Sequence, residues 1–214
     1  LINHLAVKNI AEVCNHQDCW LIHVSTDYVF DGNSQLPYRE EDKTNPQGAY
    51  GQSKLKGELV IKSSGCKYII IRTAWVFSEY GNNFLKTMLR LGTERDELSI
   101  VGDQIGCPTY AQDIAKSIVE IAPKLESRDN NGIYNFCGDQ QCSWLDFANA
   151  IFDEAIANNL KIPSIINSIE TSSYPTAAKR PTFSVLDCSK IEKDFGIPAS
   201  NWNEGIKKVL SKLS

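Results

Sequence analysis

Hydrophobic residues follow two patterns along the chain. Short continuous apolar runs, WLIHV at 20–24 and KYIIIRTAW at 67–75, predict strands that are buried on both faces. Apolar residues at helical spacing predict helices at 1–14 and at about 48–63. Strands and helices alternate through the first 140 residues, a pattern typical of an α/β protein with a parallel sheet.

The same patterns continue to the end of the chain. The helix at 48–63 is expected to bury one stripe, made of Leu55, Leu59 and Val60. Ser143, with Asp146 three residues later, has the residue types of a helix N-cap and first turn. Further helices are expected at 82–92, 111–125, 143–156, 189–195 and 202–213, and further strands within 97–110, 132–138 and 162–169.

Composition narrows the class of protein. With 42% hydrophobic and 22% charged residues in 214, the chain is expected to be globular with a sizeable core. A net charge of −4 without a basic block argues against nucleic acid as a partner, because phosphate binding needs clustered Lys and Arg. No apolar run is long enough for a membrane span, and the first residues lack the pattern of a signal peptide.

The cysteines point to a reducing compartment. Seven of them, an odd number without a CxxC pair, predict free thiols and a cytoplasmic protein. Cys14, His16, Cys19 and His23 are metal-binding residue types close in sequence, but their spacing matches no common zinc pattern. His23 also lies within an apolar run, where a hydrogen-bonded core histidine is the simpler interpretation. We therefore expect no metal site.

Three polar residues follow the first predicted strand. Ser25, Thr26 and Asp27 follow WLIHV directly, and parallel α/β sheets bind ligands beyond the carboxyl ends of their strands. The same residue types also favour turns and caps, so on this stretch alone a structural role is the simpler interpretation.

A tyrosine and a lysine, Tyr50 and Lys54, lie four residues apart on one face of the next predicted helix. A tyrosine with the usual pKa of about 10 is a poor acid at neutral pH, and a nearby ammonium would lower that pKa. A hydroxyl from Thr26 would hold a carbonyl oxygen beside Tyr50. Such a site donates a proton to a ketone that receives a hydride, and the hydride must come from a cofactor because no side chain supplies one.

A Ser/Thr after one strand and Tyr-x-x-x-Lys in the next helix resemble the short-chain dehydrogenase/reductase superfamily. Longer stretches are similar to one family within it, the dTDP-4-dehydrorhamnose reductases. Those stretches cover nearly the whole chain in the family's order: STDYVFDG, PYREED, NPQGAYGQSKLKGE, IIRTAWVF, GNNFLKTMLRL, DQIGCPT and AAKRPTFSVLD.

The resemblance implies roles for individual residues. Thr26 would orient the substrate carbonyl, Tyr50 would be the general acid, and Lys54 would tune Tyr50 and, with it, contact the ribose of NADPH or NADH. Contacts to the dTDP-sugar nucleotide would come from Thr26, Asp27, Tyr28, Trp75, Asn83, Gln104 and Arg180, with Asn82 and Phe84 beside them. A core aromatic is the structural alternative for Trp75, and a surface ion pair is the alternative for Arg180.

The resemblance also implies a doubly wound parallel Rossmann-like sheet, of which this chain holds the C-terminal part, with a smaller α/β substrate-binding domain. Residues 1–74 would belong to the NAD(P)-binding domain, with 98–124 packed back onto it. Residues 75–97 and 125–214 would bind the sugar nucleotide.

The glycine-rich turn that holds the cofactor diphosphate in this superfamily is not found in the 214 residues. The first stretch, LINHLAVKNIAEVC, resembles a helix that follows the fourth strand of a cofactor domain, so we expect roughly 75–80 residues to be missing before it. The chain alone is then expected to bind NAD(P)H poorly. An open strand edge would favour pairing with another chain, for example in a homodimer.

The activity that the resemblance implies is reduction of the C4 ketone of dTDP-4-dehydro-6-deoxy-L-mannose to dTDP-L-rhamnose, a precursor of bacterial surface polysaccharide. Two alternatives stay open. One is a non-catalytic regulatory subunit related to the beta subunit of methionine adenosyltransferase, and the other is a reductase or epimerase of another sugar nucleotide. The intact stretches RTAW and DQIGCPT favour the reductase.

Overall fold

Two apolar runs form the middle of a parallel sheet. In a computed structural model that describes residues 1–125, 130–174 and 180–213, strand β1 (Trp20–Thr26) pairs along its whole length with β2 (Lys67–Thr73). Strand β2 pairs on its other side with β7 (Gly132–Asn135), also in parallel. The predicted α/β fold with a parallel sheet is confirmed.

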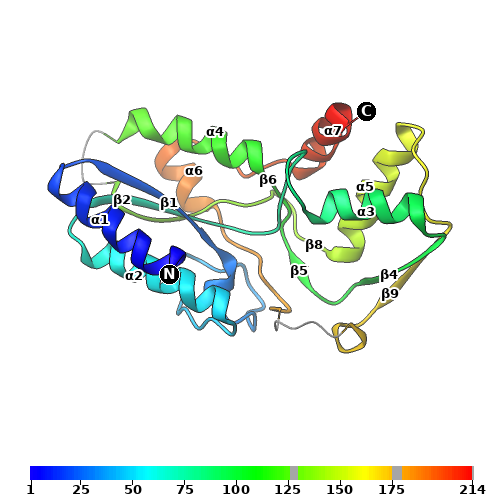
Figure 1. Cartoon of the computed structure of the whole chain (residues 1–214), viewed down its shortest axis with the longest axis horizontal. Coiled ribbons are helices and arrows are strands. Elements are labelled where there is room, and N and C mark those ends of the chain that lie inside the picture. Colours follow the sequence, from blue (N-terminus) through cyan, green and yellow to red (C-terminus); the bar gives the residue numbers. More distant parts are fainter. Residues whose placement is uncertain (126–129, 175–179, 214) are drawn as a thin grey trace.

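Helices cover both faces of this sheet (Figure 1). Helix α1 (Val7–His16), which continues a π-helical turn at Ile2–Ala6, lies with α2 (Ala49–Ser63) on one face. Helices α4 (Ala111–Ile121) and α6 (Ser189–Phe195) lie on the other. Successive residues of β2 pack against opposite layers, Ile70 with α1 and α2, and Ile69 and Ile71 with α4 and α6, so β2 is buried on both faces as predicted.

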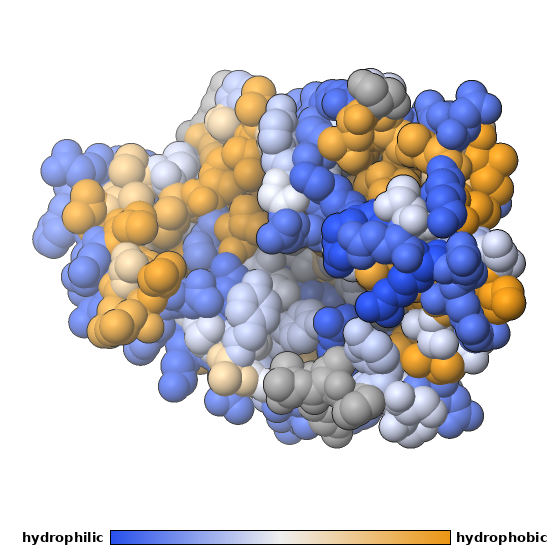
Figure 2. All heavy atoms as spheres, turned by 45° about the vertical axis from the view of Figure 1, so that its right-hand side comes forward, coloured by the Kyte–Doolittle hydropathy of each residue, from blue (hydrophilic) through white to orange (hydrophobic). Residues whose placement is uncertain are grey.

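Strand β1 is less buried than the sequence predicts. Its first four residues are half-buried and Val24 is 37% exposed, because β1 is an edge strand of the described sheet and pairs only with β2. Hydrophobic surface gathers on the left of Figure 2, in the half of the molecule that carries α1 and α2. Exposed apolar side chains of the first two helical segments are Leu1, Ile2, Leu5, Ile10 and Val13.

Helix α2 buries only part of the expected stripe, because Leu55 and Val60 pack half-buried against the core while Leu59 does not. Leu59 is 52% exposed, whereas Gly51, Gly57 and Glu58 are buried with Ile61. The helix packs against its neighbours through these glycines and through Glu58, which forms an ion pair with Arg72. A search for apolar residues at helical spacing detects neither.

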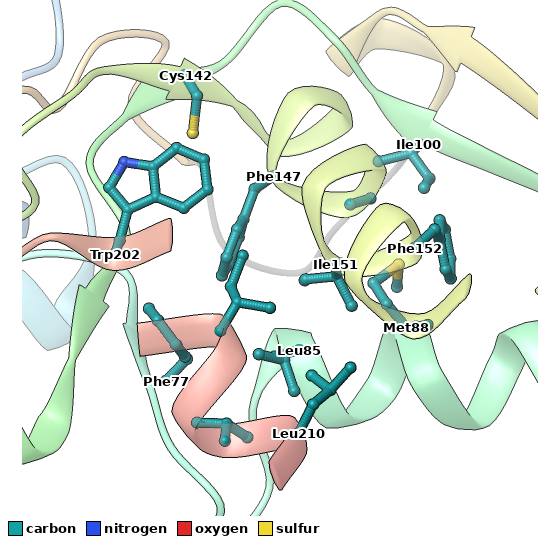
Figure 3. Packing of buried hydrophobic residues seen from close by; sticks show 14 of the residues in the cluster. Phe77, Leu85, Met88, Ile100, Cys142, Phe147, Ile151, Phe152, Trp202 and Leu210 are labelled. Carbon is teal, nitrogen blue, oxygen red and sulfur yellow. The ribbon is translucent and has the colours of Figure 1, made fainter. Parts of the chain in front are cut away.

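The second part of the molecule is built on helices α3 (Phe84–Glu94), α5 (Trp144–Ala157) and α7 (Trp202–Leu213). Their aromatic and aliphatic side chains interlock around Phe147 (Figure 3). The predicted N-cap of α5 is confirmed as a capping box between Ser143 and Asp146. Strands β4 (Glu97–Val101) and β9 (Ile165–Ile169) form a parallel pair below the helices.

Short strand pairs join the two parts. Strand β3 (Val76–Phe77) pairs with β6 (Thr109–Tyr110), and β5 (Ile105–Gly106) with β8 (Cys142–Ser143). Short helical turns lie at Asp27–Val29 (η2), Ala122–Lys124 (η3) and Thr171–Ser173 (η5).

The division of the chain departs from the expected one in three segments, one of which is helix α6, expected in the sugar-nucleotide domain but packed on the sheet. Strand β7, expected in the sugar-nucleotide domain, completes the sheet of β1 and β2, and β4, expected to pack back onto that sheet, pairs with β9 instead. Among the described residues, no helix has both the length and the apolar character needed to cross a membrane.

Candidate active site

Thr26 is the last residue of β1 and the N-cap of η2. Its Oγ1 accepts a hydrogen bond from the backbone N–H of Tyr28 at 3.3 Å, and its hydroxyl donates to Oδ1 of Asp27 at 2.9 Å. Thr26 therefore has the capping role that its residue type allows, and it also holds a hydroxyl at the carboxyl end of the sheet.

Tyr50 lies in the first turn of α2, beside this hydroxyl. Its ring meets that of Tyr28 edge-on, with the centroids 5.8 Å apart. Burial raises the pKa of Tyr50, a hydrogen bond with Thr26 lowers it, and the charge of Asp27 raises it, with a net pKa above the usual 10. Tyr50 is still 53% exposed, so a ligand can reach it.

Lys54 lies one turn further along α2. Its Nζ donates to the backbone carbonyl of Val24 at 2.6 Å. Burial lowers the pKa of Lys54, and the carboxylate of Glu58 opposes this. We expected Lys54 to lower the pKa of Tyr50. In the structure the ammonium bonds to β1, and the pKa of Tyr50 is raised by burial instead.

Asp27 is a buried carboxyl next to both hydroxyls. It is only 3% exposed, and its Oδ2 has no hydrogen-bond partner. Burial raises its pKa to about 6, although hydrogen bonds from Thr26, Ser184 and the backbone act in the opposite direction. A group that changes charge close to neutral pH therefore lies in contact with Thr26.

A buried ion pair supports these residues from behind. Arg72 of β2 donates to both carboxylate oxygens of Glu58, through Nη2 at 2.7 Å and Nε at 3.0 Å. The hydroxyl of Ser25, the neighbour of Thr26, donates to the same carboxylate at 2.5 Å. Glu58 lies two turns after Tyr50 on α2, so this pair ties the helix to both strands.

A large cavity lies in the second part of the molecule, between α3, β4 and the start of α5. Its volume is about 890 Å³, and its walls combine apolar side chains with two cations, Arg95 and Arg180, and one carboxylate, Glu97. Phe84, Gln104 and Trp144 also line it. Aromatic walls with a few polar and positively charged groups suit an anionic ring compound such as a nucleotide.

The residues expected to contact the sugar nucleotide fall into three groups. Thr26, Asp27 and Tyr28 lie around Tyr50. Burial raises the pKa of Tyr28, and the positive charge of Arg180 partly offsets that rise. Gln104 and Arg180 line the cavity. Asn83 is outside its lining, because its side chain caps α3 by accepting from the N–H of Lys86 and donates to the carbonyl of Ser78.

Trp75 packs against a second tryptophan and against the core beside the cavity. Its indole is half-buried and stacks on that of Trp144, with centroids 3.5 Å apart and an interplanar angle of 6°. It is not among the residues that line the cavity, whereas Trp144 is.

Residues 14–23 bring Cys14 and Cys19 close together but add no third metal ligand to them. Cys14 is buried against α2 and Cys19 is exposed. His23 is half-buried, and its Nε2 has no hydrogen-bond partner, in contrast to the hydrogen-bonded histidine we expected; burial lowers its pKa to about 4. In the part of the chain that the structure describes, no three His, Cys, Asp or Glu residues form a group suited to a metal ion.

Comparison with known proteins places this site in a family. All 214 residues match the family described as RmlD substrate binding domain. The dTDP-4-dehydrorhamnose reductase of Aggregatibacter actinomycetemcomitans is 47% identical over 211 residues, which are 97% of this chain and 72% of that protein. The chain belongs to the dTDP-4-dehydrorhamnose reductase family.

Solved structures from this family share the fold. A dTDP-4-dehydrorhamnose reductase from Clostridium acetobutylicum matches with a TM-score of 0.90 and 37% identity, over 99% of this chain and 72% of that one. The enzyme from Bacillus anthracis, in complex with NADP, matches with a TM-score of 0.87 and 35% identity, over 98% of this chain and 72% of that one.

Glu58, Arg72, Arg95 and Trp144 were not found from the sequence. Glu58 had a signal, because it continues the Tyr50–Lys54 face of α2 by four more residues. Trp144 had none, since a tryptophan at the start of a hydrophobic helix has the same pattern as a core residue.

Proposed function

We propose that the protein is a dTDP-4-dehydrorhamnose reductase, which transfers a hydride from NADPH or NADH to the C4 ketone of dTDP-4-dehydro-6-deoxy-L-mannose. The observation that carries this proposal is the contact between Tyr50 and Thr26 at the carboxyl end of β1, where a tyrosine and a threonine hydroxyl converge beside an exposed surface. The 47% identity to a reductase of this name supports it.

Tyr50 would give its proton to the ketone oxygen as that oxygen gains negative charge. Thr26 would hold the same oxygen. Its hydroxyl proton is directed to Asp27 when no substrate is bound, so the hydroxyl must turn away from Asp27 to donate to the ketone. Asp27 is almost fully buried, its unpartnered carboxyl oxygen included, so its part in binding would be to hold Thr26 rather than to touch the sugar.

The described residues fit one end of a nicotinamide cofactor. Tyr50 is exposed and Lys54 is half-buried on the same face, a hydroxyl and an ammonium suited to a ribose. The cofactor supplies the hydride when bound. No other group of this chain is assigned to it.

The cavity would hold the nucleotide half of the substrate. Arg180 lies between Tyr28, whose pKa it lowers, and the ring of Trp144, 5.9 Å from its centroid. A guanidinium in that position suits the diphosphate, which joins the sugar to the nucleoside. Arg95 and Gln104 offer further donors on the walls.

The experiment is to follow NADPH and NADH absorbance with the full-length protein and dTDP-4-dehydro-6-deoxy-L-mannose. Oxidation that requires the keto sugar supports the proposal, and tight dTDP binding without oxidation points to a non-catalytic subunit. The corresponding UDP and GDP keto sugars are the controls. Faster turnover with either of them would replace the proposed substrate.

A further inference from the structure

Three of the residues expected to contact the sugar nucleotide touch one side chain that was not expected there. Trp75, Gln104 and Arg180 come from distant segments of the chain, and each contacts the indole of Trp144. We propose that Trp144 is a positioning residue, which holds these three groups in the arrangement that binds a nucleoside-diphosphate sugar. The inference rests on the proposed function and concerns the same site.

The first contact fixes Trp75. Its backbone has a φ of 45°, in the left-handed region that a bulky residue adopts only where its surroundings hold it. The indole stacks on Trp144 with its plane only 6° from parallel. On the side of β5, a methyl group added to Gly106 would overlap the Trp75 ring. Trp75 is therefore confined between Trp144 and a backbone that lacks a side chain.

The second contact fixes the direction of an amide. Nε1 of Trp144 donates to Oε1 of Gln104 at 3.1 Å, and Nε2 of Gln104 donates to Oγ1 of Thr171 at 3.1 Å. Because an indole N–H can only donate, the Gln104 oxygen must face Trp144. Gln104 is buried, so this pair of bonds sets which polar atoms it presents to the cavity.

The third contact acts on a cation. The guanidinium carbon of Arg180 lies 5.9 Å from the centroid of the Trp144 ring, within the range of a cation–π interaction. Arg180 is exposed, and its side chain is long. The ring of Trp144 thus favours a position of Arg180 at the mouth of the cavity.

Trp144 itself is well anchored. It is the first residue of α5, directly after Ser143, whose capping box with Asp146 fixes the start of the helix. The next turn buries Phe147 and Ala148 completely in the core. Trp144 is only half-buried and lines the cavity, so its position differs from that of a core aromatic such as Phe147.

The test compares steady-state kinetics and dTDP calorimetry of the full-length Trp144→Leu, Trp144→Phe and wild-type proteins. We expect Trp144→Leu to raise the KM for the keto sugar nucleotide, and the Kd for dTDP, about tenfold, from the combined loss of stacking and cation–π contacts. We expect kcat to change less than about threefold, because Thr26 and Tyr50 are untouched. Trp144→Phe keeps a ring but loses the N–H donor, and should recover most of the affinity.

Trp20→Phe is the matched control, since Trp20 is half-buried in β1 and outside this stack. An unchanged KM and Kd in Trp144→Leu would overturn the inference, as would a kcat that falls with no change in KM. If Trp144→Leu does not fold, Trp144→Phe decides: a wild-type Kd and KM would overturn the inference, and a rise of about threefold supports it. A wild-type protein that neither turns over the keto sugar nor binds dTDP would refute the proposed function itself.

Discussion

Burial changes what a single carboxyl can do, and Asp27 is the clearest case in this molecule. A carboxyl with the usual pKa of 3.8 would be charged at every physiological pH, but Asp27, which is almost inaccessible to water, has a pKa of about 6. Above pH 6 Asp27 is therefore charged although it is buried, which costs free energy of folding. Such a cost at a site is typical of a group that is needed for binding or chemistry.

We predict that Asp27→Asn stabilises the fold at pH 7.5 and removes part of the pH dependence of stability. The folded-state pKa is raised from 3.8 to about 6, so the stability that protonation of Asp27 contributes is complete below pH 3.8 and is lost as the pH rises through 6. At about 1.4 kcal/mol per pKa unit, the variant should gain up to roughly 3 kcal/mol at pH 7.5.

The measurement is urea unfolding of both proteins between pH 4 and 8. The difference between them should shrink as the pH falls below 6. A difference that stays constant over this range would show that the pKa of Asp27 is close to its usual value. Asp31→Asn is the control, because hydrogen bonds from Asn33 and Tyr38 lower the pKa of Asp31 below 3.8, so its effect on stability should not change with pH between 4 and 8.

Tyr50→Phe is predicted to reduce kcat by about 10²–10⁴-fold, the range for loss of a general acid. The Kd for dTDP should change little, because the cavity lies in the other part of the molecule. Stopped-flow turnover and calorimetry separate the two effects. Tyr80→Phe, at a tyrosine that is 77% exposed, is the control. A Kd that rises in parallel with the loss of rate would argue against the acid role.

Some of these residues could be predicted from the sequence because their roles depend on local spacing. Tyr50 and Lys54 share a face of α2 by helical geometry, and Thr26 follows a strand directly. The stack of Trp75 on Trp144 joins residues that lie far apart in the chain, so no local pattern predicts it. The pKa of Tyr50 depends on burial, which spacing does not reveal.

At the scale of elements, the position of α2 depends on one buried ion pair. Glu58 and Arg72 are 1% and 2% exposed, and their two hydrogen bonds join α2 to β2. Burying two charges is costly, so such a pair is weak evidence for stability, but removal of one partner leaves an uncompensated charge.

Arg72→Met should therefore lower the free energy of unfolding by about 3–5 kcal/mol. The double variant Glu58→Gln, Arg72→Met should be more stable than Arg72→Met alone, since the remaining buried charge is gone. Urea unfolding of the single and double variants measures this coupling. Equal midpoints for the two would mean that the cost of Arg72→Met does not come from an uncompensated charge on Glu58.

The elements that the sequence predicted well have a strong periodic signal. Helices α3, α5 and α7 begin and end within two residues of their expected bounds. The burial of β1 was wrong because an apolar run does not reveal whether a strand has one neighbour or two. The expected stripe of α2 was wrong at Leu59, and the most buried residues of the helix, two glycines and a paired glutamate among them, give no apolar signal.

At the scale of the whole molecule, these 214 residues offer more for binding the sugar nucleotide than for binding the cofactor. The cavity with its two arginines is present, whereas no glycine-rich phosphate-binding turn occurs. We predict that a protein made of these residues alone binds dTDP at least about 100-fold more tightly than NADPH, because a dinucleotide is held largely through its diphosphate.

Calorimetric titration of that protein with each ligand tests this expectation. Arg180→Ala should weaken dTDP binding without affecting NADPH. Micromolar affinity for NADPH would show that another surface of the chain holds the cofactor.

The two glycines of α2 affect how the protein unfolds when it is warmed. A methyl group added to Gly51 would overlap the carbonyl oxygen of Tyr28, and one added to Gly57 would overlap that of Asn3, so both allow close docking. Each also lowers helix propensity by about 1 kcal/mol, which leaves α2 dependent on its neighbours for its structure. The segment with Tyr50 and Lys54 would then open before the core of α3, α5 and α7 melts, with early amide exchange across 49–63. Enzyme activity would disappear on warming while most of the protein was still folded.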